Sequence, residues 1–166
     1  MQKDFSFKYE VFAGINELNK EDKDLLEKAR INTKSAYAPY SNFHVSAVAL
    51  LDNGETVSAT NQENASYPVA ICAERTLLGA VSSLQPDKLI KTIAISYDNK
   101  NGESIKPITP CGICRQSLVE YENRFQQNIK IIMSGLEGEV LVVENAHQLL
   151  PFSFSSDDMK VATIQK

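Results

Sequence analysis

The chain has 166 residues, a length that fits one domain with a sizeable core. Its 43% apolar and 23% charged residues are ordinary for a soluble globular protein. Acidic and basic residues are mixed, with a net charge of −4, so we expect a small uncharged ligand rather than nucleic acid. No apolar run approaches the roughly 20 residues of a membrane-spanning helix. No signal segment opens the chain either, so we expect a cytoplasmic protein with reduced thiols and no membrane partner.

The first residues carry a strand pattern that gives way to a helical one. Apolar residues alternate with polar ones from Phe5 to Val11, which predicts a short strand. From Asn19, a suitable N-cap, an apolar stripe predicts a helix that continues to Ala36 and ends before Pro39. We therefore expect an extension over residues 1–18, which adds an edge strand or an oligomer contact, and one domain over residues 19–166.

The remainder alternates between strands and helices. Core strands are predicted at residues 44–51, 56–60, 91–97, 129–133 and 140–143, the first two joined by a hairpin turn at Asp52–Glu55. Helices are predicted to begin at Cys72 and Pro110, and a short one after Asn145, while residues 61–67 form a polar loop. The tail is predicted to be polar and partly helical. Helices that alternate with five core strands indicate an α/β domain with helices on the sheet faces.

All three cysteines lie in two short segments, as Cys72 and as the pair Cys111 and Cys114. A spacing of three at a helix start places both sulfurs of the pair on one face. Helix N-termini favour negative charge and so help to keep thiolates ionised. Zinc is the metal that best suits thiolates where no redox chemistry is required. Three ligands and an open fourth position describe a catalytic zinc site rather than a structural one.

Two alternatives to an open zinc site have to be weighed. A closed site with a fourth ligand would use His44 or His147, the chain's two histidines, although neither has helix-start spacing to a cysteine. Three unrelated buried cysteines are the other alternative, which the paired spacing disfavours.

Glu74, two residues after Cys72, adds a carboxylate beside the expected metal. In the first turn of a helix, Cys72 can point at the metal while Glu74 lies alongside the open position. There a carboxylate can take a proton from zinc-bound water and return it to a substrate. The plain alternative is a surface glutamate at a helix start. Arg75 is either a donor to a thiolate or an ordinary solvated arginine.

Together these segments are the all-cysteine version of the zinc nucleobase-deaminase signature, in which the glutamate is a general acid and base and not a ligand. The chain resembles the small homotetrameric cytidine deaminases, members of the cytidine and deoxycytidylate deaminase family, from Tyr37 to Phe154. Five stretches carry this resemblance: Tyr37 to Val45, Asn61 to Tyr67, Ile71 to Thr76, Pro110 to Gln116 and Leu149 to Pro151. It implies a three-layer α/β/α domain with a five-stranded mixed sheet and a short N-terminal extension.

The resemblance also implies roles for single residues. Cys72, Cys111 and Cys114 correspond to the ligands of one Zn²⁺ per subunit, and Glu74 to the proton shuttle. Asn61 and Glu63 match the pair that holds the ribose 3′-hydroxyl, Phe43 the ring stacked on the pyrimidine, and the backbone of Ala73 a contact to the base. Ala65, Tyr67 and Phe154 match positions that complete a neighbouring subunit's site. Arg75 and Gln116 resemble groups behind the ligands that tune the thiolates.

The reaction expected from this resemblance is hydrolytic deamination of cytidine and 2′-deoxycytidine in pyrimidine salvage, in which zinc-bound hydroxide attacks C4 and Glu74 shuttles protons. Rival interpretations are a deaminase of a nucleotide, free base, nucleoside antibiotic or RNA base, a zinc-stabilised binding module, and a catalytically silent relative. His44 and Ser46 depart from the family's frequent proline and glycine, and neither is among the expected ligands or proton carriers.

Overall fold

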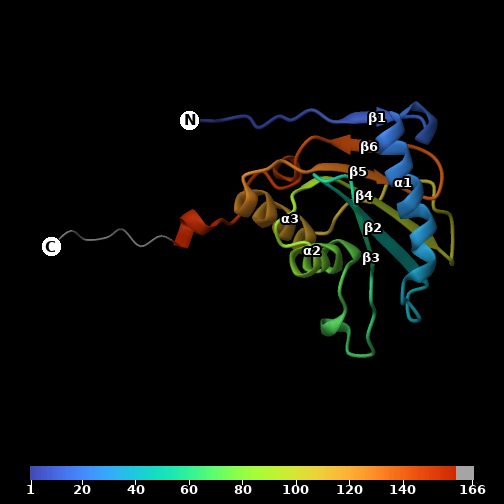
Figure 1. The fold of residues 1–166 in the computed structure, drawn as a ribbon. Helices are drawn as coiled ribbons and strands as arrows, with labels where there is room; N and C mark the ends of the chain where they lie inside the picture. Colours follow the sequence, from blue (N-terminus) through green and yellow to red (C-terminus); the bar gives the residue numbers. More distant parts are fainter. Residues whose placement is uncertain (160–166) are drawn as a thin grey trace.

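The computed structural model describes residues 1–159, which fold around a six-stranded mixed sheet (Figure 1). Its strands lie in the order β1-β6-β5-β4-β2-β3. Their bounds are β1 Glu10–Phe12, β2 Phe43–Leu51, β3 Thr56–Thr60, β4 Ile90–Asn99, β5 Lys130–Ser134 and β6 Val140–Val143. The pair β4 and β5 is parallel, and all other neighbours are antiparallel. The prediction of five strands is wrong by one, because β1 joins the sheet at the edge of β6.

Helices cover both faces of the sheet, which confirms the three-layer α/β/α arrangement (Figure 1). The helices are α1 Lys20–Asn32, α2 Ala73–Leu84 and α3 Gly112–Phe125. On one face, Leu26 of α1 packs in a cluster with Val48 and Ile132 of the sheet. On the other face, Leu77 of α2 and Leu118 of α3 belong to a second cluster with the opposite side chains of the same strands. Apolar residues on both faces of the central strands are what allow these strands to be buried completely.

Two predicted boundaries differ from the structure by more than two residues. The N-terminal strand comprises Glu10–Phe12, so the alternating residues from Phe5 to Tyr9 lie outside it. The first helix ends at Asn32 instead of continuing to Ala36, and a 3₁₀ turn follows at Thr33–Ser35. The Thr33 hydroxyl donates to the Arg30 carbonyl at 2.8 Å, which supplies a side-chain partner to the last helical turn.

Two capping residues and one turn agree with the prediction. Asn19 caps α1 by accepting from the Asp22 N–H at 3.0 Å, and Asn145 caps the short 3₁₀ helix Ala146–Leu149 by accepting from Gln148 N–H at 3.1 Å. Gly54 has φ of +83° in the turn between β2 and β3, a conformation that glycine adopts without steric cost. Within residues 1–159, the helices are all too short or too polar to cross a membrane.

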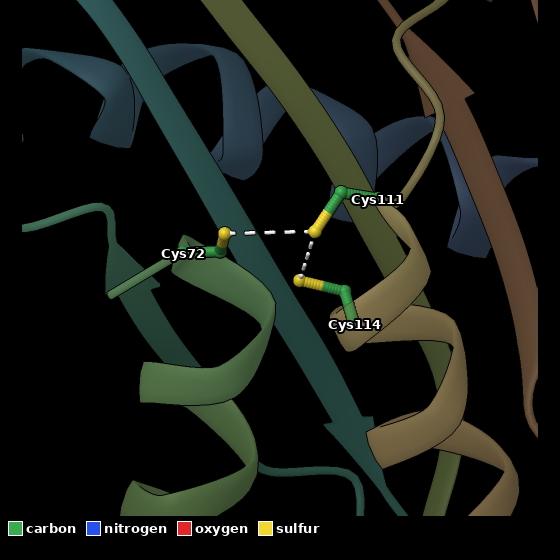
Figure 2. Close-up of side chains that lie close together, drawn as sticks. All are labelled: Cys72, Cys111 and Cys114. Atoms are coloured by element: carbon green, nitrogen blue, oxygen red, sulfur yellow. Dashed lines mark hydrogen bonds between the residues drawn. The ribbon is translucent and has the colours of Figure 1, made fainter. Parts of the chain in front are cut away.

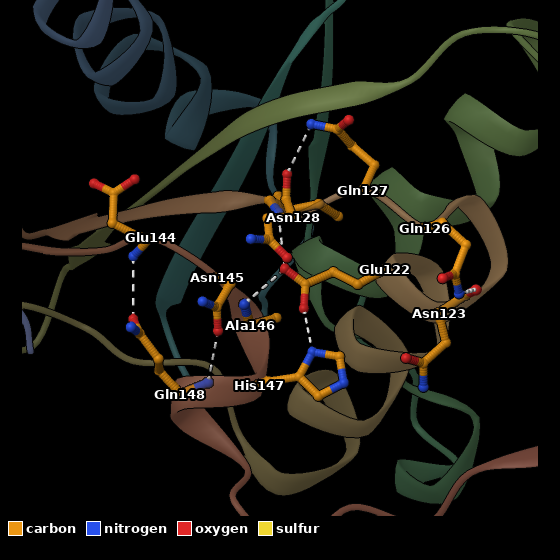
Figure 3. A network of polar contacts seen from close by, with 11 residues as sticks. Glu122, Asn123, Gln126, Gln127, Asn128, Glu144, Asn145, Ala146, His147 and Gln148 are labelled. Carbon is orange, nitrogen blue, oxygen red and sulfur yellow. Dashed lines mark hydrogen bonds and ion pairs between the residues drawn. The ribbon is translucent and has the colours of Figure 1, made fainter. Parts of the chain in front are cut away.

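A buried carboxylate ties the C-terminal part of the chain to α3 (Figure 3). Glu122, which is 3% exposed, accepts through Oε1 from the backbone N–H groups of Ile129 at 2.7 Å and Ala146 at 2.8 Å. Its Oε2 lies 2.6 Å from Nδ1 of His147. A buried carboxylate needs several such partners to offset its desolvation. Glu122 therefore fixes the segment that leads from β6 toward Phe154.

Candidate metal centre and active-site cavity

The three cysteines converge at the N-terminal ends of α2 and α3, where the structure brings their sulfurs together (Figure 2). Cys72 is the N-cap of α2, Cys111 is the N-cap of α3, and Cys114 lies in the first turn of α3. The Sγ atom of Cys111 lies 3.9 Å from Sγ of Cys72 and 3.5 Å from Sγ of Cys114. All three are free thiols rather than disulfides. Two helix starts thus supply a compact set of sulfur donors.

This donor set fits zinc in both chemistry and size. Tetrahedral zinc with Zn–S bonds of about 2.3 Å separates its sulfurs by about 3.8 Å, and the two sulfur distances, 3.5 Å and 3.9 Å, bracket that value. The cluster lowers the pKa of Cys72 to about 6, chiefly through its hydrogen bond with Cys114. The same contact raises the pKa of Cys114 above the usual thiol range. One thiolate is therefore favoured in the cluster by the neighbouring thiols, and both helix N-termini add to this effect.

Neither histidine joins the cysteines. Over the part of the chain that the structure describes, the group able to hold a metal consists of Cys72, Cys111 and Cys114. His147 is bound to Glu122, and His44 lies near the start of β2 with its Nδ1 atom buried and, within residues 1–159, without a hydrogen-bond partner. The closed site with a histidine ligand is therefore not formed, which leaves a fourth position open.

Glu74 lies in the first turn of α2, and its residue is only 6% exposed. Burial raises the pKa of its carboxyl group above the ordinary glutamate value, because water no longer stabilises the charged form. The plain alternative of a solvated surface glutamate is therefore wrong. A buried carboxyl group beside three thiols, facing a cavity, is the arrangement expected of a proton carrier.

Cys72, Cys111 and Glu74 line a cavity of about 230 Å³, while Cys114 is buried behind the other two sulfurs. Its walls come from β2, from the loop after β3 and from the N-terminal ends of α2 and α3. The lining residues are Val45, Asn61, Gln62, Glu63, Ala70, Ile71, Cys72, Ala73, Glu74 and Cys111. Besides Glu74, five residues that the sequence singled out line this one cavity: Cys72, Cys111, Asn61, Glu63 and Ala73.

Asn61 and Glu63 lie in the cavity wall and are fixed by backbone groups. The Asn61 side chain accepts from Val45 N–H at 2.8 Å and donates to the Phe43 carbonyl at 2.9 Å, which clamps the loop to β2. Oε2 of Glu63 accepts from Tyr40 N–H at 2.9 Å and Ser41 N–H at 3.3 Å. Hydrogen bonding, first of all with Ser41, lowers the pKa of Glu63, so this carboxylate stays charged. Both groups retain lone pairs or protons for a ligand.

Phe43 does not line this cavity, and its ring packs against a second aromatic ring. It is stacked on Tyr97 of β4, with centroids 4.8 Å apart and planes 17° apart. Tyr97 is also the cross-strand partner of Val45, which lines the cavity. The sequence reasoning missed Tyr97, since the pairing of β2 with β4 brings together residues more than fifty positions apart.

Comparison with known proteins settles the family. A family model described as the cytidine and deoxycytidylate deaminase zinc-binding region matches residues 19–128. The chain belongs to this family. A cytidine deaminase from Halalkalibacterium halodurans is 36% identical over 140 residues, covering 83% of this chain and 98% of the relative. A crystal structure of cytidine deaminase from Burkholderia pseudomallei has a TM-score of 0.68 and 33% identity, covering 79% and 97% of the two chains. Blasticidin-S deaminase from Bacillus cereus is 31% identical over 106 residues, covering 63% and 75%.

Three further residues singled out for this deaminase do not line the cavity, although Tyr67 lines a neighbouring pocket that shares Glu63 and Ala70 with it. Ala65 and Tyr67 belong to the exposed loop before α2, and Tyr67 is 72% exposed, with an edge contact to Tyr40 at 5.9 Å. Phe154 is 58% exposed in the C-terminal segment. Backbone hydrogen bonds hold both segments, yet the side chains of these residues are exposed at the surface.

Arg75 and Gln116, which were expected to tune the thiolates from behind the ligands, lie in different surroundings. Arg75 makes no hydrogen bond to a sulfur within residues 1–159; it lines a groove between α2 and α3 and lowers the pKa of Cys72 through its charge. Gln116 donates to the Phe154 carbonyl at 2.8 Å. Arg115, to which no role was given, donates to the carbonyls of Pro110 at 2.8 Å and Leu149 at 3.1 Å. Arg115 and Gln116 thus bind the C-terminal segment to the helix that carries the cysteine pair.

Proposed function

We propose that this deaminase hydrolyses cytidine and 2′-deoxycytidine to uridine and 2′-deoxyuridine with release of ammonia, as a step of pyrimidine salvage. The observation that carries the proposal is a cluster of three thiols beside a cavity that Cys72, Cys111 and the buried Glu74 line, and whose wall also holds Asn61 and Glu63. Similarity to curated cytidine deaminases supports the choice of nucleoside. Either nucleoside has the base and 3′-hydroxyl that this set of groups can recognise.

Cys72, Cys111 and Cys114 would hold the zinc ion at the N-terminal ends of α2 and α3. When bound, zinc supplies Lewis acidity that brings the pKa of a coordinated water near neutrality. Three thiolates would leave a negative site. The N-terminal ends of both helices and the charge of Arg75 offset part of that negative charge.

Glu74 is the group that moves protons. Water adds to C4 of the pyrimidine while Glu74 takes a proton from that water and delivers it to N3. Glu74 then takes the remaining proton from the new C4 hydroxyl group and delivers it to the amino group. The C4 carbonyl forms, the bond from C4 to the exocyclic nitrogen breaks and ammonia leaves. Because Glu74 is buried against the cavity, it exchanges protons with the substrate in preference to bulk solvent.

The other wall of the cavity would select the sugar. Asn61 and Glu63 offer an amide and a charged carboxylate that suit the 3′-hydroxyl of a nucleoside. A carboxylate that stays ionised at this position disfavours a phosphate, and so disfavours nucleotides and RNA. Phe43, supported by Tyr97, would provide the aromatic platform for the base, and the backbone of Ala73 a polar contact.

The proposal extends to the assembly. Ala65, Tyr67 and Phe154 would complete the site of a neighbouring subunit in a homotetramer, which accounts for aromatic side chains that are exposed on hydrogen-bonded segments. A cytoplasmic location, where thiols remain reduced, suits a site made of three free cysteines.

A nucleoside antibiotic is the second candidate substrate, favoured by the similarity to blasticidin-S deaminase. The purified protein should be incubated with cytidine, deoxycytidine, cytosine, deoxycytidine monophosphate, adenosine and blasticidin S, with the ultraviolet spectrum followed and zinc measured per chain. We expect cytidine and deoxycytidine to be turned over and the others to react at least about a hundredfold more slowly, as expected where a required polar contact is lost. One zinc per chain without turnover of any compound would contradict the proposal and indicate a binding module.

A further inference from the structure

Residues 4–12, here called the N-terminal arm, form a strand-like segment outside the family region at 19–128. Phe5, Phe7, Tyr9 and Val11 alternate with polar residues, and each is 43% to 57% exposed. The aromatic rings touch one another, with centroids 6.3 Å apart for Phe5 and Phe7 and 6.0 Å apart for Phe7 and Tyr9. Figure 1 shows the arm continuing from β1 to the N-terminus as an extended segment. Four large apolar side chains are thus displayed in a row.

The arm leads into the exposed edge of the sheet. β1 comprises the last three residues of the arm and pairs on one side with β6, as Glu10 with Val142 and Phe12 with Val140. It is the terminal strand in the sheet order, so within residues 1–159 no strand pairs with its other side. An open edge presents unpaired backbone N–H and C=O groups and is a ready template for another strand. The arm therefore continues an edge that can accept a further strand.

The apolar side of the arm also borders a groove. Phe7, Tyr9 and Val11 form one wall of a cavity of about 350 Å³, and Met133 and Leu141 of the sheet are part of the floor. Side chains that line an exposed apolar groove next to an open strand edge offer both parts of a β-type docking surface, namely backbone partners and pockets for alternate side chains.

We propose that two copies of this chain pair through their N-terminal arms as antiparallel strands, related by a twofold axis at Tyr9. This register joins the two sheets across their β1 edges. It places Phe7 of each copy opposite Val11 of the other, which buries the apolar row of both arms. It also places Lys8 opposite Glu10 twice, so both arms contribute a complementary charge pair.

Charge distinguishes this register from its neighbours, which also align apolar residues. An axis at Lys8 would oppose two lysines, and an axis at Glu10 would oppose two glutamates. An axis at Phe7 would place Asp4 against Glu10. Like charges directly opposite one another destabilise a strand pair. Tyr9 is therefore the axis, among those inside Phe7–Glu10, that opposes no like charges.

This contact is separate from the proposed catalytic site. The cavity wall includes Val45 of β2, and β2 lies toward the opposite edge of the sheet from β1. Changes in the arm should therefore leave the deamination rate per chain unchanged, and that rate serves as a control for correct folding.

Disulfide cross-linking of the full chain tests the register directly. Two cysteines at the axis position would face each other, and opposite residues of an antiparallel pair lie about 4.5 to 5.5 Å apart, within the range that a disulfide spans. We expect Tyr9→Cys to give a dimer on a non-reducing gel after mild oxidation. The matched control Phe5→Cys, on the same side of the arm, should not cross-link, because its opposite residue is Ala13. The unmodified chain, with its three native cysteines, is the blank.

Charge exchange tests the partner. In the Tyr9→Cys background, Lys8→Glu or Glu10→Lys alone should reduce cross-linking about tenfold, since two attractive pairs become repulsive. The double variant Lys8→Glu with Glu10→Lys should restore it. Equal cross-linking of the Phe5 and Tyr9 variants, no cross-linking at Tyr9, or single reversals without effect would each overturn the proposal.

Discussion

The cysteine cluster and the segments that carry Tyr67 and Phe154, here called the outer rim, are held in place in different ways. Cys72, Cys111 and Glu74 lie at two adjacent helix starts, and each is positioned by the N-cap or first turn of its helix. Tyr67 and Phe154 lie on segments between and after the longer helices and strands, and both are exposed and do not line the cavity of their own chain. One chain can therefore assemble the reactive groups alone, whereas we expect the enclosure of the substrate to require another chain. Breaking each region separately should produce different kinetic defects.

Removal of a thiol should have the largest effect. Replacing Cys111 by Ser exchanges the sulfur for a poorer zinc ligand while leaving a residue that can still cap α3. We expect zinc per chain to fall from one to near zero and deamination to be lost, as measured by elemental analysis and an ultraviolet assay. The exposed neighbour Ile113, changed to Val, should retain both. Full zinc and full turnover in the Cys111 variant would exclude this residue as a ligand.

The next largest effect should come from Glu74→Gln, which preserves shape but removes the proposed proton carrier. General acid–base catalysis contributes about a hundredfold to ten-thousandfold, so kcat should fall by that amount. Zinc content and the affinity for a product such as uridine should remain near those of the unchanged protein. Calorimetric titration together with single-turnover kinetics would separate the two properties. Near-normal kcat would contradict the role of Glu74.

The two regions also differ in how well the sequence predicted them. Cys72, Glu74 and the pair at 111 and 114 follow a local rule, because residues near a helix start have nearly fixed relative positions. Tyr97 beside Phe43 and Arg115 against Leu149 depend on pairings between distant segments, which no local pattern encodes. The alternation from Phe5 to Val11 predicted a strand, but a strand also needs a neighbour to hydrogen-bond with, and β6 accompanies only the last residues of the arm.

Phe154→Ala tests whether the rim is shared between chains. If the Phe154 ring packs on the substrate of a neighbouring chain, its loss should raise KM about tenfold with a smaller change in kcat. Assemblies that mix Phe154→Ala chains with Glu74→Gln chains should regain turnover at the original KM, because some sites then combine an intact Glu74 with an intact Phe154. Each variant mixed with itself is the control. If Phe154 serves its own chain, no mixture will show the low KM.

The smallest effect should come from Tyr97, which by the proposal would act on the base only through Phe43. Tyr97→Leu removes the ring that stacks on Phe43 at 4.8 Å and leaves the phenylalanine free to turn. An aromatic pair is worth about 0.5 to 1.5 kcal/mol, so KM for cytidine should rise about threefold while kcat stays constant. Tyr97→Phe keeps the ring and should have the original KM. A raised KM in both variants would assign the effect to the hydroxyl group. Equal KM values for all three proteins would show that β2 positions Phe43 without help from Tyr97 of β4. The aromatic platform would then belong, like the cysteines, to the part of the site that is fixed by a single element.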